Sequence, residues 1–271
     1  MEIGVHQLAY GGHAGRLSSL LAAGSNADER DSDGATPLML ASGRGHARCT
    51  KLLLKVGAAV EASDKDGCTP LYMAAMNGHV TTTNLLLAAG ANLFAPSVGK
   101  LVPFHEAATR GKVGVMEAHV LAGMSVDYHV SDGPTALYCA VEHNQIKAVT
   151  FLLARGANPA FSLEGFTPLE TASRTKGSGD TIRKLIAMVG LEKCGGRLGN
   201  GEDALHRAAM CGQEDVMDIL YTAGARDVHG WALRAAVSFG GGEHAVKFLL
   251  KRPPYPLRIY VNMSVAGVTG T

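Results

Sequence analysis

One interval, 33 residues, recurs along this chain and constrains its fold more than any other feature of the sequence. Glycine returns at that interval at Gly24, Gly57, Gly90, Gly123 and Gly156. Three further columns keep the same spacing: His13, His46 and His79; leucine pairs at 20–21, 53–54, 86–87 and 152–153; and Thr36, Thr69, Val102 and Thr135. Because four independent columns share one period, the chain is predicted to be a row of similar modules that stack on one another.

Each period has the content of two short helices joined by a tight turn. Thr36 is expected to cap a first helix that begins at Pro37, where the missing N–H of proline costs nothing. Gly45-His46 then turns the chain into a second helix, which ends at Gly57, a position that favours a left-handed backbone. Helices this short cannot bury their apolar sides alone, so contacts between neighbouring modules are expected to stabilise the fold.

These modules resemble the ankyrin repeat. The ankyrin T-P-L-H-x-A signature is similar to residues 36–41, 69–74 and 167–172. The G-H turn of the family matches Gly45-His46 and Gly78-His79, and its L-L-L-x-x-G-A-N helix end matches residues 85–92. The resemblance covers residues 2–252 and implies an all-α, ankyrin-repeat solenoid of stacked helix–turn–helix units with short β-hairpin loops. It also implies that the histidines of the signature and the turn make structural hydrogen bonds, here His6, His13, His46, His79 and His206.

The predicted ankyrin-repeat domain is 1–252, and a C-terminal tail at 253–271 matches no repeat. It divides into about eight repeats: 2–33, 34–66, 67–99, 100–132, 133–164, 165–200, 201–228 and 229–252. The step from Thr167 to Asp203 is 36 residues, with the extra length expected near 176–180 and Asp203 expected to cap in place of threonine. Because glycine-rich residues 193–200 also break the pattern, limited proteolysis is expected to cut first within 174–202.

The sequence carries no motif for catalysis, nucleotide binding or a metal site. His105-Glu106-Ala107-Ala108-Thr109 departs from H-E-x-x-H at its last position, and Gly99-Lys100 lacks the residues that complete a phosphate loop. The cysteines form no C-x-x-C pair and are expected to be reduced: Cys49, Cys68, Cys139, Cys194 and Cys211. We therefore predict no enzyme activity, no cofactor and no metal.

Charge and hydropathy limit the partners further. The formal net charge of +1 gives no general attraction to nucleic acid or to anionic lipid. The sequence shows no secretory signal, and no apolar run approaches the roughly 20 residues that span a bilayer. With 46% hydrophobic residues, the chain is expected to be folded. It is also expected to be soluble, monomeric and intracellular, in the cytoplasm or the nucleus.

The leading functional hypothesis is a protein–protein interaction scaffold that binds a peptide or a folded protein through its concave face. One alternative is the substrate-recognition part of a larger signalling or ubiquitin-ligase adaptor assembly. A second alternative is an enzyme that uses the irregular segment 174–202 and the tail.

The resemblance implies that partners contact the hairpin tips and the exposed positions of each first helix. The candidate protein-binding residues are Asp33, Arg44, Lys65, Asp66, Met76, Asn77, Arg110, Glu142, His143, Leu163, Phe166 and Arg174. The acidic tips, from Asp28 to Asp33 with Asp64 and Asp66, could receive a basic segment, although aspartate is common in such loops. Phe161, Leu163 and Phe166 could anchor a partner beside arginine. They could equally pack between adjacent hairpins.

Overall fold

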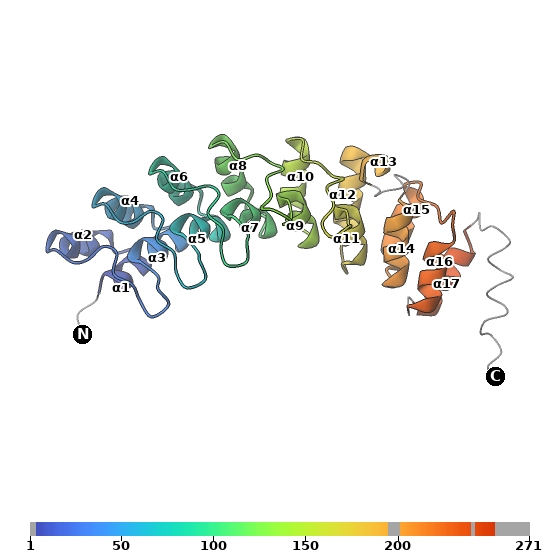
Figure 1. Ribbon diagram of the computed structural model, residues 1–271, viewed down its shortest axis with the longest axis horizontal. Coiled ribbons are helices and arrows are strands. Elements are labelled where there is room, and N and C mark those ends of the chain that lie inside the picture. The colour runs from blue at the N-terminus through green and yellow to red at the C-terminus, as the bar shows by residue number, and fades with distance from the viewer. Residues whose placement is uncertain (1–3, 195–200, 240–241, 253–271) are drawn as a thin grey trace. The chain divides into compact units, whose positions relative to one another are not determined.

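The computed structural model describes residues 4–194, 201–239 and 242–252, and the regular elements in these ranges are helices (Figure 1). The chain divides into two compact units, with the boundary between Ala140 and Val141 inside α9 (Ala136–Glu142). The predicted tail, 253–271, lies outside the described residues.

In the N-terminal unit the helices come in pairs. The first helices are α1 (Val5–Tyr10), α3 (Pro37–Gly43), α5 (Pro70–Asn77) and α7 (Pro103–Thr109). The second helices are α2 (Ala14–Ala22), α4 (Ala47–Lys55), α6 (Val80–Ala88) and α8 (Val113–Leu121). First helices pack against first helices in chain order and second against second, so that this unit has two layers (Figure 1). The predicted stacking of helix pairs is confirmed.

The C-terminal unit repeats this arrangement with less regular spacing. Its helices are α10 (Ile146–Ala154), α11 (Pro168–Arg174), α12 (Gly179–Val189), α13 (Leu191–Cys194), α14 (Glu202–Met210), α15 (Glu214–Thr222), α16 (Trp231–Ser238) and α17 (Gly242–Leu250). Helices α11, α14 and α16 pack side by side, and α10, α12, α15 and α17 form the second layer. The exact boundaries of the repeats stay a prediction.

Threonine caps start several first helices as the sequence predicts. The Oγ1 atom of Thr36 accepts from the N–H of Met39 at 3.4 Å, and that of Thr69 from the N–H of Tyr72 at 3.2 Å. In the C-terminal unit the Thr167 hydroxyl accepts from the N–H of Glu170 at 3.3 Å. A proline follows each of these caps as the first helical residue, where no helical N–H is lost.

One prediction for the later repeats is wrong. Asp203 is not the cap of its helix, because it lies inside α14, which begins at Glu202 and has Gly201 as its N-cap with a φ of 74°. The extra length lies partly near 176–180, where the linker between α11 and α12 has four residues against three between α3 and α4, and it continues into α12, which has 11 residues against nine in α10. Inserted residues can join a helix without disturbing the layer it belongs to.

The repeating glycines end the second helices and share one environment. The φ values are 91° at Gly24, 86° at Gly57, 86° at Gly90 and 100° at Gly123, in the left-handed region that disfavours other residues. At all four positions an added Cβ atom would meet open space. The requirement for glycine is therefore conformational and is not a matter of space.

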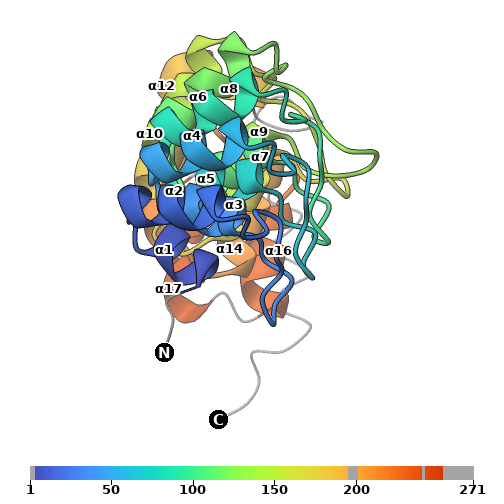
Figure 2. The ribbon, with the colours of Figure 1, turned by 90° about the vertical axis from the view of Figure 1, so that its left-hand side faces the viewer.

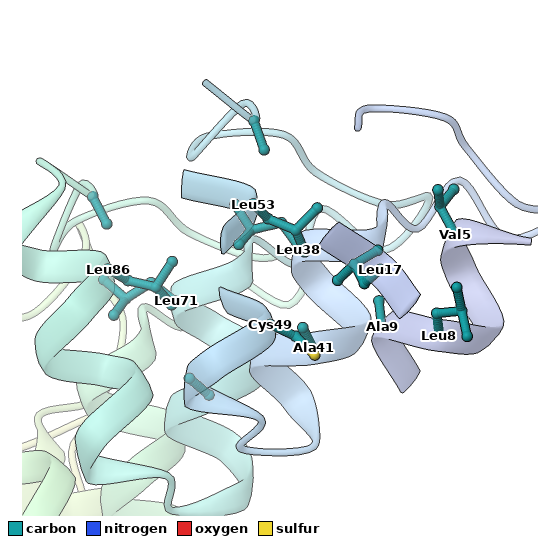
Figure 3. Close-up of a cluster of buried hydrophobic side chains, with 13 residues drawn as sticks. Val5, Leu8, Ala9, Leu17, Leu38, Ala41, Cys49, Leu53, Leu71 and Leu86 are labelled. Carbon is teal, nitrogen blue, oxygen red and sulfur yellow. The ribbon is translucent and has the colours of Figure 1, made fainter. Parts of the chain in front are cut away.

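The core of the N-terminal unit is a row of leucines between the two layers. Figure 3 shows Leu38 and Leu71 from the first helices beside Leu17, Leu53 and Leu86 from the second. Each of these five side chains is at most 1% exposed. Because every leucine faces its neighbours in the next repeat, the buried apolar surface grows with each repeat added.

The loops between repeats are tight turns that project from one side of the N-terminal unit (Figure 2). Successive tips are joined by backbone hydrogen bonds, from the Lys65 N–H to the Asp33 carbonyl at 3.2 Å and from the Val98 N–H to the Asp66 carbonyl at 2.9 Å. Among the described residues, strand pairing is limited to one bridge, between Leu163 and Phe166. The expected β-hairpins are thus reduced to turns.

Candidate protein-interaction site

Several histidines link one repeat to the next. The Nε2 atom of His46 lies 2.9 Å from the Tyr10 carbonyl oxygen, and that of His79 lies 3.1 Å from the Gly43 carbonyl oxygen. His6 and His206 bond to backbone carbonyls in the same way. The structural role expected for His6, His46, His79 and His206 is confirmed, and that of His13 stays a prediction. The described residues contain no group of three His, Cys, Asp or Glu side chains placed to hold a metal ion.

Much of the acidic charge at the early tips is used inside the loops. The Oδ1 oxygen of Asp31 accepts hydrogen bonds from the N–H of Asp33 at 2.9 Å and from the N–H of Ala35 at 2.8 Å. Asp64 makes the equivalent two bonds one repeat later. The Asp28 carboxylate accepts from the Ala59 N–H at 2.8 Å. These bonds favour the structural interpretation of the acidic tips. Of the predicted binding residues, Asp33, Lys65 and Asp66 lie exposed beside them.

Two candidate residues at the ends of the first helices of the N-terminal unit, Arg44 and Asn77, are exposed but held in place. The guanidinium carbon of Arg44 lies 4.0 Å from the centroid of the Tyr10 ring, and the same guanidinium donates to the Tyr10 hydroxyl. Asn77 is exposed and donates to the Met73 carbonyl at 3.0 Å, and Met76 beside it is half-buried. Such prior ordering lowers the entropy lost when a partner binds.

Arg110 is positioned by a buried network. Its guanidinium pairs with the carboxylate of Glu106, which also accepts from the Tyr72 hydroxyl at 3.1 Å. Burial, followed by the effect of the nearby Glu106 charge, raises the pKa of Tyr72 to about 12. The phenol therefore stays protonated and keeps its bond to the carboxylate at physiological pH.

In the C-terminal unit, Phe166 supports two arginines. The guanidinium carbon of Arg207 is 4.5 Å from the ring centroid and that of Arg174 is 5.4 Å from it. Leu163 is bonded to Phe166 through the backbone, by hydrogen bonds of 3.0 and 2.9 Å. Both Leu163 and Phe166 are half-buried. The predicted grouping of Phe166, Leu163 and Arg174 is thus observed, with Arg207 added.

A hollow of about 580 Å³ opens beside this group. It is lined by Ala160, Ser162, Gly165, Thr167, Glu170, Asp203, His206, Arg207 and Trp231. Two other predicted residues of this unit, Glu142 and His143, are exposed at the end of α9 and are not among its lining residues. Arg110 belongs to the other unit.

The hollow contains charges of both signs. Burial, and then the neighbouring Asp203 carboxylate, raise the pKa of Glu170, while the Arg207 guanidinium lowers it. Within the described part of the chain, neither Arg174 nor Arg207 lies within ion-pairing distance of a carboxylate. Their N–H donors are therefore free to meet an acceptor on a partner.

The sequence prediction missed Arg207 and Trp231. Arg207 occupies the variable position of the signature, in His206-Arg207-Ala208, and Trp231 stands where a regular repeat has its threonine. Projecting the variable position of each repeat, as well as the end of each first helix, would have found Arg207. The stacking of Arg207 on Phe166 is a contact between the loop before α11 and helix α14, which the pattern within one repeat does not give.

Comparison with known proteins decides the family. The model of the family described as ankyrin repeats (3 copies) matches residues 5–96 and 104–194, more than half of the chain. The chain is an ankyrin-repeat protein. It is similar to the human ASB11 ankyrin repeat domain, with a TM-score of 0.72 and 29% identity, over 84% of this chain and 100% of that one.

A second relative is much longer than this chain. The ankyrin-repeat chain is 29% identical over 150 residues to the human transient receptor potential cation channel subfamily A member 1. That match covers 50% of this chain and 13% of the channel. Ankyrin repeats are generally protein–protein interaction modules and are typically non-enzymatic, so the broad class predicted from the sequence is supported. No helix in the described ranges combines the length and apolar character needed to cross a membrane.

Proposed function

We propose that this ankyrin-repeat protein binds a protein partner through its first helices and inter-repeat loops, with Phe166, its two arginines and the hollow beside them as the main anchor point. In ankyrin arrays these elements form the concave face, which offers a long preformed surface. The peptide or folded partner would contact exposed residues of the N-terminal unit such as Arg44 and Asn77, and separately the hollow of the C-terminal unit.

The single observation that supports this most is the pair of arginines on the Phe166 ring. Arginine and aromatic residues are enriched among those that dominate binding energy, because they bury large areas and make directional hydrogen bonds. Arg174 and Arg207 keep their donors unpaired beside a hollow that the half-buried Trp231 helps to line. Because this arrangement is already formed in the free protein, little conformational entropy is lost when a partner covers it.

The test compares partners captured by proximity labelling in cells. The double variant Arg174→Ala/Arg207→Ala should lose most of the labelled partners, while Arg183→Ala, an exposed arginine on α12 in the other layer, should keep them. Thermal melting of each purified variant shows whether the fold is intact. Retention of the same partners by a folded double variant would overturn the proposal.

A larger assembly is the second candidate, favoured by the much greater length of the channel relative. In this case the repeats would be the recognition part of a signalling or ubiquitin-ligase adaptor assembly. Size-exclusion chromatography of the native protein from its source cells distinguishes the larger assembly from the simple scaffold. A stable high-mass complex of constant composition supports the assembly, and a free chain supports the simple scaffold.

A further inference from the structure

Another hollow lies in the N-terminal unit, in the layer of second helices, between α2 and α4. It has a volume of about 480 Å³ and is lined by Ala14, Gly15 and Ser18 of α2 and by Arg48, Lys51, Leu52 and Lys55 of α4. An added Cβ atom at Gly15 would meet open space, so small residues on α2 leave the hollow unfilled. Leu52, which is half-buried, adds an apolar side chain to its lining.

The cations beside this hollow form one row. Arg48, Lys51 and Lys55 are spaced by three and then four residues, which places them on a single face of α4. All three are exposed, and none forms an ion pair within the described part of the chain. Like charges at this spacing repel one another, so the row destabilises the isolated helix slightly.

No acidic residue in the neighbouring helices offsets this row. Helices α2, α4 and α6 contain no aspartate or glutamate, and α2 adds Arg16. The chain as a whole has a net charge of only +1, so the positive charge here is a local feature. The residues that line the hollow therefore carry three positive charges and no negative one, so an acidic group would be attracted to it.

We propose that the α2–α4 groove binds a short acidic segment of a partner protein. Carboxylates of the segment would pair with Arg48, Lys51 and Lys55, and one apolar side chain would enter the hollow above Leu52. Helix α4 has nine residues and is about 13 Å long, which matches about four residues of extended chain. This site is separate from the proposed binding through the first helices and the loops.

The confinement of the charge favours a peptide over a membrane or nucleic acid. Those ligands present wide anionic surfaces and are usually met by basic residues spread across several elements. The next helix in this layer, α6, has no charged residue at all. The basic surface thus ends at the groove.

The experiment uses the full chain and a fluorescein-labelled peptide of sequence Asp-Glu-Leu-Asp-Glu, followed by fluorescence anisotropy. Lys51→Glu/Lys55→Glu should weaken binding at least about tenfold, and raising the salt from about 0.05 to 0.5 M should weaken it for the wild type. The control, Lys147→Glu/Lys176→Glu, makes the same change in net charge at exposed lysines of the other unit and should bind as the wild type does.

A second variant leaves the charge unchanged. Gly15→Leu should fill the hollow and weaken binding about three- to tenfold, as expected for losing one buried apolar side chain. Its circular dichroism spectrum and melting curve show whether the fold is kept. Melting of the lysine variant should likewise match the wild type.

Four results would overturn the proposal. The first is absence of peptide binding by the wild type, and the second is an equal loss of binding in the groove and control lysine variants. The third is binding of phosphatidylserine vesicles with no binding of the peptide. The fourth is self-association of the wild type, seen in sedimentation and abolished by Lys51→Glu/Lys55→Glu, while the peptide does not bind. The last would assign the groove to a second copy of this chain, whose loops are acidic.

Discussion

The guanidinium of Arg207, on α14, lies over the ring of Phe166, in the loop that precedes α11, with 4.5 Å between the guanidinium carbon and the ring centroid. A half-buried arginine over an aromatic face is attracted by the ring quadrupole, with a gain of about 0.5–2 kcal/mol. Because Arg174 approaches the same ring, one aromatic side chain orients two cations. Phe166 is therefore the residue whose removal should disturb this site most.

Phe166→Ala is expected to weaken partner binding by about 2 kcal/mol or more while changing stability little, because the ring is half-buried. Calorimetric titration with a captured partner and a thermal melt measure the two effects. Phe239→Ala, at a phenylalanine that is 68% exposed at the end of α16, is the matched control and should affect neither. A fall in melting temperature with unchanged affinity would instead assign Phe166 to packing between loops.

The parts of this fold that short-range chemistry decides could be predicted from the sequence. The Thr36 cap, the proline after it and the left-handed glycine at Gly57 each act within a few residues, so the period alone located them. The start of α14 could not be predicted in the same way. Asp203 and Gly201 both suit a helix start, and the choice between them depends on packing across the irregular repeats.

The candidate site was predictable to a similar extent. Exposure at the loop tips and at the ends of first helices follows from the repeat, and the predicted residues are exposed or half-buried. The contacts that order them do not follow from it. Arg110 depends on Glu106 and Tyr72, and Arg44 depends on Tyr10, and the repeat pattern does not fix the identity of these partners.

Leu53→Ala is expected to lower the free energy of unfolding by about 2–5 kcal/mol, because the fully buried leucine leaves a cavity between repeats. Urea denaturation followed by circular dichroism measures the change. Leu121→Ala removes the same atoms from a side chain that is 80% exposed, so it should cost less than about 0.5 kcal/mol. Equal effects of the two variants would contradict the buried role of Leu53 in the stack.

The stability of the N-terminal unit should fall in mild acid because of His105. This side chain is 1% exposed, its Nε2 lies 2.9 Å from the Tyr128 carbonyl oxygen, and burial lowers its pKa from 6.5 to about 4. Above pH 6.5 the ring is neutral in both the folded and unfolded states. Between pH 6.5 and about 4 the unfolded state binds the proton more tightly, so folding loses stability as the pH falls.

At pH 5.0 this difference amounts to about 2 kcal/mol relative to pH 7.5. Urea unfolding at the two pH values, for the wild type and for His105→Gln, isolates the contribution of this one residue. The variant should be less stable at pH 7.5, where a packed ring is lost, and the gap should narrow at pH 5.0. A gap that is the same at both values would show that His105 does not carry the pH dependence.

Asp227 replaces the missing threonine at the start of α16. Its Oδ1 accepts from the N–H of Ala232 at 3.0 Å and its Oδ2 from the N–H of Leu233 at 2.9 Å, while the N-cap residue, Gly230, has no side chain to offer. The residue is 2% exposed, so both bonds are shielded from water. Asp227→Ala would leave two buried donors unpaired at the helix start, at a cost of about 1–3 kcal/mol.

Asp227→Asn should recover part of that loss, because one oxygen acceptor remains and the unfavourable charge interaction with Glu202 disappears. Hydrogen exchange of the amides in α16 is the sensitive measurement, since repeats open locally before the whole array unfolds. Faster exchange in α16 for the alanine variant, with an intermediate rate for asparagine and no change in α3, is the expected pattern. Unchanged protection in Asp227→Ala would mean that packing against α14 alone sets where α16 begins.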